Sequence, residues 1–67
     1  MRPIDAAIVE TLQRNGPCPL DDVLTSLSIF PRGEIFDSVD RMSREGRVLL
    51  SKLGYTTYLL SLDSHGK

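Results

Sequence analysis

The 67-residue sequence lacks the residues that several classes of function need. Its one cysteine, Cys18, excludes an internal disulfide framework and a four-cysteine zinc site. Its one histidine, His65, stands in a polar C-terminal stretch, with no second metal ligand or catalytic base near it in sequence. No apolar run approaches the roughly 20 residues of a membrane span, and Met1-Arg2-Pro3 does not open a signal peptide. We therefore expect a reduced, cytoplasmic protein that holds no metal.

A strong charge of either sign is also missing. Eight Lys and Arg face nine Asp and Glu, for a formal net charge of -1. A protein that coats a polyanion would usually be strongly basic, so the total charge argues against one, although it leaves room for a basic face. The short length allows one domain with one small core, since such a chain buries only about 60% of its unfolded surface.

The features of an enzyme are absent as well. The sequence contains no phosphate-binding glycine loop, no nucleophile elbow and no paired acid and base with a recognisable spacing. A single thin core also leaves little room for a substrate cavity. We expect a protein that is not an enzyme and has no cofactor and no small-molecule substrate.

What the chain does contain is a clear succession of turn residues, which predicts three helices followed by a strand pair. The predicted helices cover residues 3–14, 19–27 and about 31–45, and Asn15-Gly16 and Gly46 stop the first and third. Apolar residues fall at helical spacing on one face of each segment. These are Ile4, Ala7, Ile8, Thr11 and Leu12, then Leu20, Val23, Leu24 and Leu27, then Ile35, Phe36, Val39 and Met42.

After Gly46 the apolar period changes from 3.6 to 2, which indicates a β-hairpin. For the apolar residues of both strands to share a face, Val48 is expected to oppose Leu60, and Leu50 to oppose Tyr58. That register leaves residues 53–55 as a three-residue loop. The sequence thus predicts an α+β protein with a single domain over residues 1–62 and a polar, flexible tail over residues 63–67.

Helix, helix, turn, helix and hairpin in this order resembles a winged helix-turn-helix domain. The stretch Leu20-x-x-Val23-Leu24-x-x-Leu27 resembles the first helix of the motif. The pattern Ile35-x-x-x-Val39-x-x-Met42-x-x-x-Gly46-x-Val48 is similar to its recognition helix and first wing strand, and Tyr58-Leu59-Leu60-Ser61 is similar to the second. Two features depart from the family. The link over residues 28–31 is about one residue longer than usual, and the proline-broken segment 17–19 does not favour the short strand that many members add to the sheet.

The resemblance implies binding of double-stranded DNA, with the third helix in the major groove and the wing on phosphates. The first hypothesis is accordingly a small winged-helix DNA-binding protein, a transcriptional regulator or accessory factor that acts as a dimer. The implied contacts are Arg32, Ser38, Arg41 and Arg44 on the helix, Arg47 and Lys52 beside or on the wing, and Tyr55 and Thr56 at its tip. Residues 32–53 carry five basic and four acidic side chains, so positive charge gathers there only weakly.

The same residues support a second hypothesis. Asp37 and Arg41, Asp40 and Arg44, and Arg41 and Glu45 have the i,i+4 spacing of helical ion pairs, so this face of the helix is equally compatible with a solvated surface. Apolar residues also stand on the hairpin, where Leu49 and Leu59 are expected to oppose each other on the outer face and Leu53 and Tyr55 lie at the tip. They indicate contact with a second copy or a protein partner through the wing. The second hypothesis is therefore a winged-helix protein-interaction module without significant DNA binding, which uses the wing or the mixed-charge helix.

Overall fold

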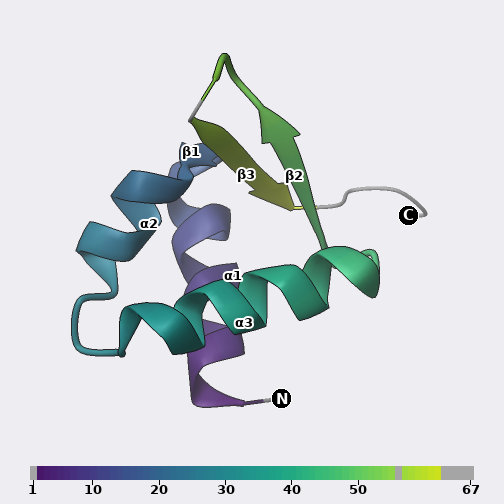
Figure 1. Ribbon diagram of the computed structural model, residues 1–67. Coiled ribbons are helices and arrows are strands. Elements are labelled where there is room, and N and C mark those ends of the chain that lie inside the picture. The colour runs from purple at the N-terminus through teal and green to yellow at the C-terminus, as the bar shows by residue number, and fades with distance from the viewer. Residues whose placement is uncertain (1, 56, 63–67) are drawn as a thin grey trace.

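The computed structural model describes residues 2–55 and 57–62, which form an α+β structure of three helices and one antiparallel sheet. The elements are α1 (Pro3–Asn15), β1 (Cys18–Pro19), α2 (Leu20–Ser26), α3 (Arg32–Arg44), β2 (Val48–Lys52) and β3 (Tyr58–Leu62). α3 crosses in front of α1, and the hairpin of β2 and β3 rises from the C-terminal end of α3 (Figure 1). The layout is compatible with the expected winged-helix arrangement. The expectations for Thr56 and for the tail, residues 63–67, lie outside the described residues.

The ends of α1 and α3 follow the signals in the sequence. Pro3 starts α1 where its missing N–H costs nothing, and Gly16 stops it at φ 76°, with its N–H donating to the Leu12 carbonyl at 2.8 Å. Gly46 follows α3 at φ 79°, and the Arg47 N–H donates back to the Met42 carbonyl at 2.9 Å. These two glycines set the directions in which the chain leaves the helices, so Gly46 also sets where the hairpin begins.

The segment before α2 forms a short strand, which its two prolines did not favour. Cys18 and Pro19 form β1, which pairs with Leu60 and Leu59 at one edge of the sheet, and α2 begins at Leu20 rather than Pro19. Proline is tolerated on an edge strand because its missing N–H need not take part in the ladder. The sheet therefore has three strands in the order β1-β3-β2.

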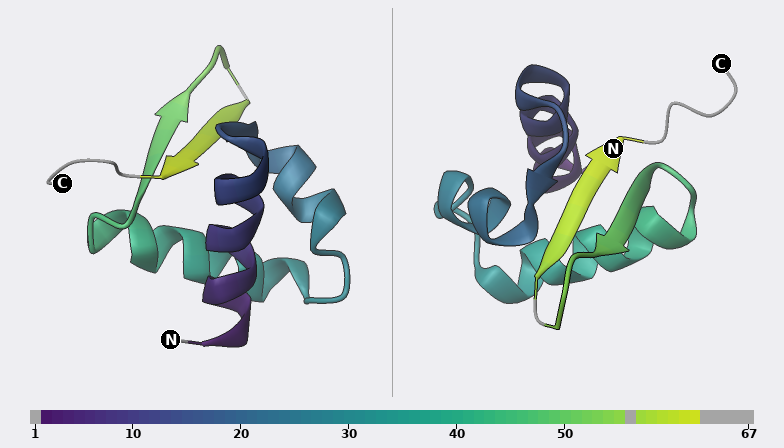
Figure 2. Two further views of the ribbon diagram at one scale, coloured as in Figure 1. Left: turned by 180° about the vertical axis from the view of Figure 1, so that it is seen from behind. Right: turned by 90° about the horizontal axis from the view of Figure 1, so that it is seen from above.

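The hydrophobic core lies where the helices meet the inner side of the sheet. Its buried members are Ile4, Ile8, Leu12, Cys18, Val23, Leu24, Leu27, Ile35, Val39, Met42, Val48 and Leu60. The helical spacing predicted most of these positions. Phe36, expected on the buried face of α3, is instead exposed at its edge. Leu50 and Tyr58, expected on the core side of the hairpin, are also exposed. The hairpin extends past the helices toward its tip, where Tyr58 lies (Figures 1 and 2), and Leu50 belongs to the edge strand β2.

The register of the hairpin differs from the predicted one by two residues. Val48 opposes Leu62, Leu50 opposes Leu60 and Lys52 opposes Tyr58. The last paired residues of the two strands are therefore Lys52 and Tyr58 rather than Lys52 and Thr56, and beyond them the Leu53 N–H donates to the Thr57 carbonyl at 2.7 Å. A shift of two keeps every side chain on its original face, so the apolar pattern could not distinguish the two registers. Leu49 and Leu59 consequently oppose Ser61 and Ser51 instead of each other.

Candidate binding surface

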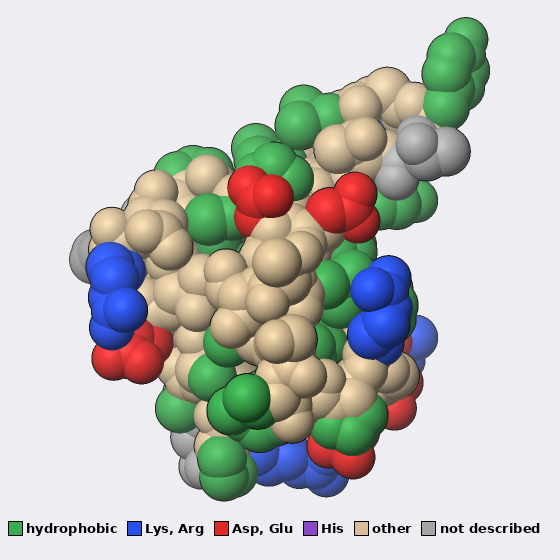
Figure 3. All heavy atoms as spheres, turned by 90° about the vertical axis from the view of Figure 1, so that its left-hand side faces the viewer, with side chains coloured by type: hydrophobic (Ala, Val, Ile, Leu, Met, Phe, Trp, Pro, Cys, Tyr) green, Lys and Arg blue, Asp and Glu red, His purple; other side chains and the backbone are tan. Residues whose placement is uncertain are grey.

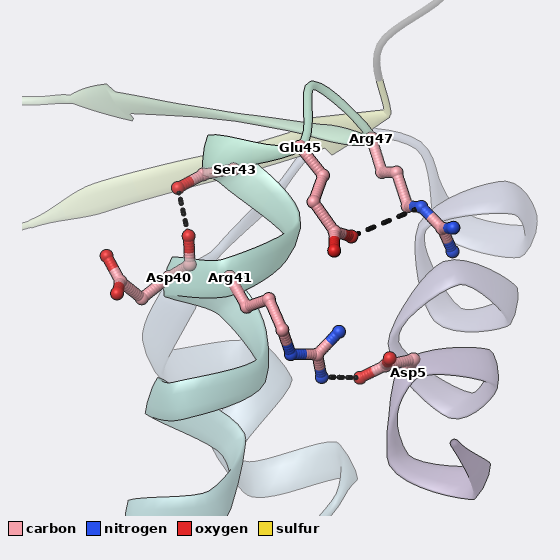
Figure 4. Close-up of polar contacts among 6 residues, drawn as sticks. All are labelled: Asp5, Asp40, Arg41, Ser43, Glu45 and Arg47. Carbon is pink, nitrogen blue, oxygen red and sulfur yellow. Dashed lines mark hydrogen bonds and ion pairs between the residues drawn. The ribbon is translucent and has the colours of Figure 1, made fainter. Parts of the chain in front are cut away.

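Arg41, expected on the exposed side of α3, points toward α1 and binds Asp5 there (Figure 4). Its Nη2 donates to Asp5 Oδ1 at 2.8 Å, and the Asp5 side chain is only 3% exposed, against 36% for that of Arg41. The hydrogen bond from Arg41 lowers the pKa of Asp5 below its ordinary value of 3.8, although burial opposes the shift. The same bond raises the pKa of Arg41. The pair joins α1 to α3 across the edge of the core.

Ser38, the second expected DNA contact on α3, lies on the same inner side and is buried. Its hydroxyl also acts to lower the pKa of Asp5. Ser38 and Arg41 thus support the carboxylate of Asp5, and Ser38 does not lie on the outer side of α3 where a DNA contact was expected. The sequence held one signal for this site. Asp5 precedes Ile8 by three residues and Leu12 by seven, so it stands on the apolar face of α1.

The remaining arginines near the end of α3 are exposed but paired with carboxylates. Arg44 Nη2 lies 3.2 Å from Asp40 Oδ2, which confirms the i,i+4 pair expected from the sequence. Arg47 Nε lies 3.3 Å from Glu45 Oε1, so Glu45 pairs with Arg47 rather than with Arg41. Exposed pairs of this kind contribute little to stability, typically about 0.2–1 kcal/mol. They nevertheless place a carboxylate beside each of these guanidinium groups.

Arg32 and Lys52 complete the expected basic set, and within the described residues neither forms an ion pair. Both are exposed, Arg32 at the start of α3 and Lys52 at the end of β2. Between them the helix also exposes Asp37 and Asp40. The outer side of α3 therefore carries carboxylates near its middle.

The hairpin has a different character, because it exposes large hydrophobic side chains on both of its faces. We call this set the hairpin surface; it consists of Leu49, Leu50, Leu53, Tyr55 and Tyr58. Tyr55 at the tip is 95% exposed. The space-filling view shows hydrophobic side chains along the projecting hairpin, whereas acidic and basic side chains are scattered over the body (Figure 3).

Three of the four residues expected in a protein contact belong to this surface, namely Leu49, Leu53 and Tyr55. The fourth, Leu59, is half-buried because β3 is the central strand and Pro19 of β1 lies beside it. Leu50 and Tyr58 were missed, since the alternation of the hairpin assigned them to the core. Leu50 is exposed because β2 is an edge strand, and Tyr58 because it lies at the end of β3 next to the turn.

Surface hollows also lie elsewhere on the described chain. One of about 400 Å³ is lined mainly by small polar residues between α1 and α2, including Thr11, Asn15 and Thr25. Another, of about 270 Å³, lies between the start of α1 and α3. Over residues 2–55 and 57–62, no group of three His, Cys, Asp or Glu side chains is placed to hold a metal ion. In the same residues no helix has the length and apolar character needed to cross a membrane.

Comparison of the chain with protein-family models, with curated proteins and with solved structures gave no match. The candidate surface therefore has to be interpreted from its own residues.

Proposed function

We propose that this protein is a winged-helix domain that binds another protein through the hairpin surface. The observation that carries the proposal is the exposure of five large hydrophobic side chains on one projecting hairpin. Scattered exposed apolar residues are ordinary, but a cluster on a projection is typical of an interaction site. The order of the elements supports the winged-helix assignment, as does β1, the short additional strand that many members have.

The residue types fit this role. Tyrosine is enriched among the residues that dominate binding energy, because it offers a large contact area together with a hydroxyl group and has few rotatable bonds. The partner should present a mainly apolar surface to Tyr55 and Leu53 at the tip, with a hydrogen-bond acceptor for the Tyr55 hydroxyl. Lys52, exposed beside the tip, favours an acidic residue at the margin of that surface.

DNA binding is the second candidate, and the exposure of four basic side chains favours it. Arg32, Arg44, Arg47 and Lys52 are all exposed along α3 and the hairpin. The ion pairs of Arg44 and Arg47 are weak enough for a phosphate to replace the carboxylate. This candidate ranks second because Asp37 and Asp40 lie on the outer side of α3 and would repel a phosphate backbone.

Affinity capture with matched variants tests the first proposal. Purified wild-type protein, the double variant Leu53→Ser/Tyr55→Ser and a control variant Ile29→Ser are each coupled to resin and exposed to lysate of the source cells. Ile29 is a suitable control because it is 86% exposed yet lies in the link between α2 and α3, away from the hairpin. We expect the wild type and the control to retain the same protein and the double variant to retain at least tenfold less. Equal retention by all three would contradict the proposal.

Titration with duplex DNA separates the two candidates. Amide shifts are mapped by NMR at low and moderate salt for the wild type and for Arg44→Glu. If DNA is the ligand, shifts concentrate in residues 32–44 and 47–55 and fade steeply as salt rises, and Arg44→Glu weakens them sharply. If the hairpin binds protein, Arg44→Glu leaves partner capture unchanged, and DNA at moderate salt moves none of these amides.

A further inference from the structure

The sheet has two edges, and they differ in their ability to accept another strand. β1 is two residues long and ends in Pro19, which has no N–H to donate. β2 is five residues long, and along its outer side the views show no further element of the described chain (Figures 1 and 2). β2 therefore offers a free hydrogen-bonding edge, of the kind that pairs readily with another strand.

The hydrogen-bond pattern shows which groups β2 presents. The Leu53 N–H donates to the Thr57 carbonyl, and these two residues continue the register of the hairpin. Hydrogen-bonded pairs alternate along an antiparallel ladder, so Ser51 and Leu49 also bond toward β3. The N–H and C=O groups of Val48, Leu50 and Lys52 consequently point away from β3, to the open side.

From this pattern we infer that β2 pairs with β2 of a second copy of the chain, antiparallel and about a twofold axis at Leu50. The inference rests on the proposed role of the hairpin in protein contacts, and it adds a second copy of the chain as the partner of the open edge. With the axis at Leu50, Leu50 meets its own counterpart and Val48 meets Lys52, so all three outward residues of both copies form hydrogen bonds. Moving the axis by one residue would pair an outward residue with Gly46 or Gly54, which lie outside the strand.

The side chains suit this register. The two Leu50 side chains meet on one face, and each Leu49 opposes a Ser51 on the other. Lys52 meets Val48, so no like charges oppose each other. The antiparallel direction also carries the tip of each hairpin to the base of the other. There the half-exposed carboxylate of Glu45, which pairs with Arg47 of its own chain, would attract Lys52 of the second copy. The apolar and charged groups along the β2 edge of one copy therefore match those along the β2 edge of the second copy.

Disulfide trapping tests both the partner and the register. Leu50→Cys is compared with Leu53→Cys, each with Cys18 replaced by Ala, in a glutathione redox buffer. Hydrogen-bonded antiparallel partners have Cα atoms about 5.5 Å apart, which suits a disulfide. Leu53 is exposed to a similar extent, at 50% against 41%, but in this register the two Leu53 positions are six residues apart along the paired strands, roughly 20 Å.

We expect Leu50→Cys to form the cross-linked dimer at least tenfold faster than Leu53→Cys. Equal rates would show random collisions of the hairpins and would overturn the register. A strict monomer in sedimentation at 1 mM, with no trapping at position 50, would overturn the second copy as partner. Neither result would alter the retention of a different protein in the capture experiment, so failure of this inference is distinguishable from failure of the proposed function.

Leu50→Pro provides an independent check on the same edge. It removes an outward N–H while the bonds between β2 and β3 remain, so the hairpin should persist. We expect this variant to keep the amide pattern of the fold and to sediment as a monomer at concentrations where the wild type associates. A folded Leu50→Pro variant that still dimerises would contradict pairing through β2.

Discussion

The Asp5 carboxylate lies in the contact between α1 and α3, where Arg41 and Ser38 act on it. Burying a charge is costly unless it is paired and hydrogen-bonded, and the 2.8 Å bond from Arg41 supplies that compensation. The partner could not be read from the sequence, because it is 36 residues away and Asp37 offered Arg41 a local alternative at i,i+4 spacing. Tertiary packing decided between the two carboxylates, since it turned Arg41 toward α1.

The lowered pKa of Asp5 predicts an acid-dependent stability. Because the folded pKa lies below the ordinary 3.8, the contribution of Asp5 is present above about pH 3.8 and lost as the pH falls below it. Asp5→Asn should therefore be about 1–2 kcal/mol less stable than the wild type at pH 7, and the difference should shrink between pH 4 and pH 2. Urea unfolding followed by circular dichroism measures both. Asp37→Asn, a substitution of an exposed residue on α3, is the control, and its stability should differ little from that of the wild type at any of these pH values.

Two glycines associated with α3 should respond in opposite ways to replacement by alanine. Gly46 has φ 79°, which costs a residue with a Cβ atom about 1 kcal/mol, whereas Gly33 lies within the helix and has open space where a Cβ atom would stand. Gly46→Ala should destabilise the protein by about 1 kcal/mol, and Gly33→Ala should stabilise it by up to about 1 kcal/mol. Thermal unfolding of the two variants provides the measurement. Destabilisation of equal size in both would contradict the conformational argument.

At the scale of elements, the hairpin combines a fixed base with an exposed end. Leu50 and Leu60 are directly opposite in the ladder, yet Leu60 is completely buried and Leu50 is exposed. The difference arises because β3 is the central strand and lies over the core, whereas β2 is an edge. The hairpin can therefore expose a binding surface without losing its own attachment.

Replacing each member of this opposing pair should show which of the two side chains attaches the hairpin to the core. Leu60→Ala removes a fully buried side chain and should cost about 2–4 kcal/mol, a large part of the stability of a domain this small. Leu50→Ala removes an exposed one and should cost less than about 1 kcal/mol. Urea unfolding at neutral pH gives both values. Similar losses in the two variants would show that the hairpin packs more closely on the helices than its exposure indicates.

The sequence predicted those elements whose bounds depend on nearby residues, and it failed where contacts between distant segments decide the structure. The helix bounds followed from Pro3, Gly16 and Gly46, whose effects are confined to adjacent turns. The register of the hairpin could not be predicted from the apolar pattern, because a shift by two residues keeps every side chain on the same face. β1 did not follow either, since its pairing with Leu59 and Leu60 is a contact between distant segments. The apolar residues at the tip, Leu53 and Tyr55, follow from the sequence. The exposure of Leu50 and Tyr58 did not follow, because alternation alone does not show how far the helices cover each strand.

For the whole molecule, the distribution of charge matters more than its sum. The basic residues at the end of α3 have carboxylate partners, and the net charge of the chain is -1. A dimer formed through β2 would have twice the net charge of one chain and would remain slightly acidic. Affinity for DNA depends on the number of phosphates neutralised, so at physiological salt we expect a dissociation constant no tighter than about 10⁻⁴ M, the weak end of non-specific binding.

The carboxylates on the outer side of α3 account for this expectation and can be removed. Asp37→Asn/Asp40→Asn changes the net charge from -1 to +1, since two negative charges are lost, and it frees Arg44 from its partner. We expect the double variant to bind duplex DNA several-fold more tightly than the wild type at 50 mM salt, and the gain to vanish by 200 mM, because the added attraction is electrostatic. Fluorescence anisotropy with a labelled duplex measures both. Asp21→Asn/Asp22→Asn makes the same change of charge on α2 and should produce a smaller gain. Equal gains from the two pairs would mean that only the total charge matters, and that α3 has no special position toward DNA.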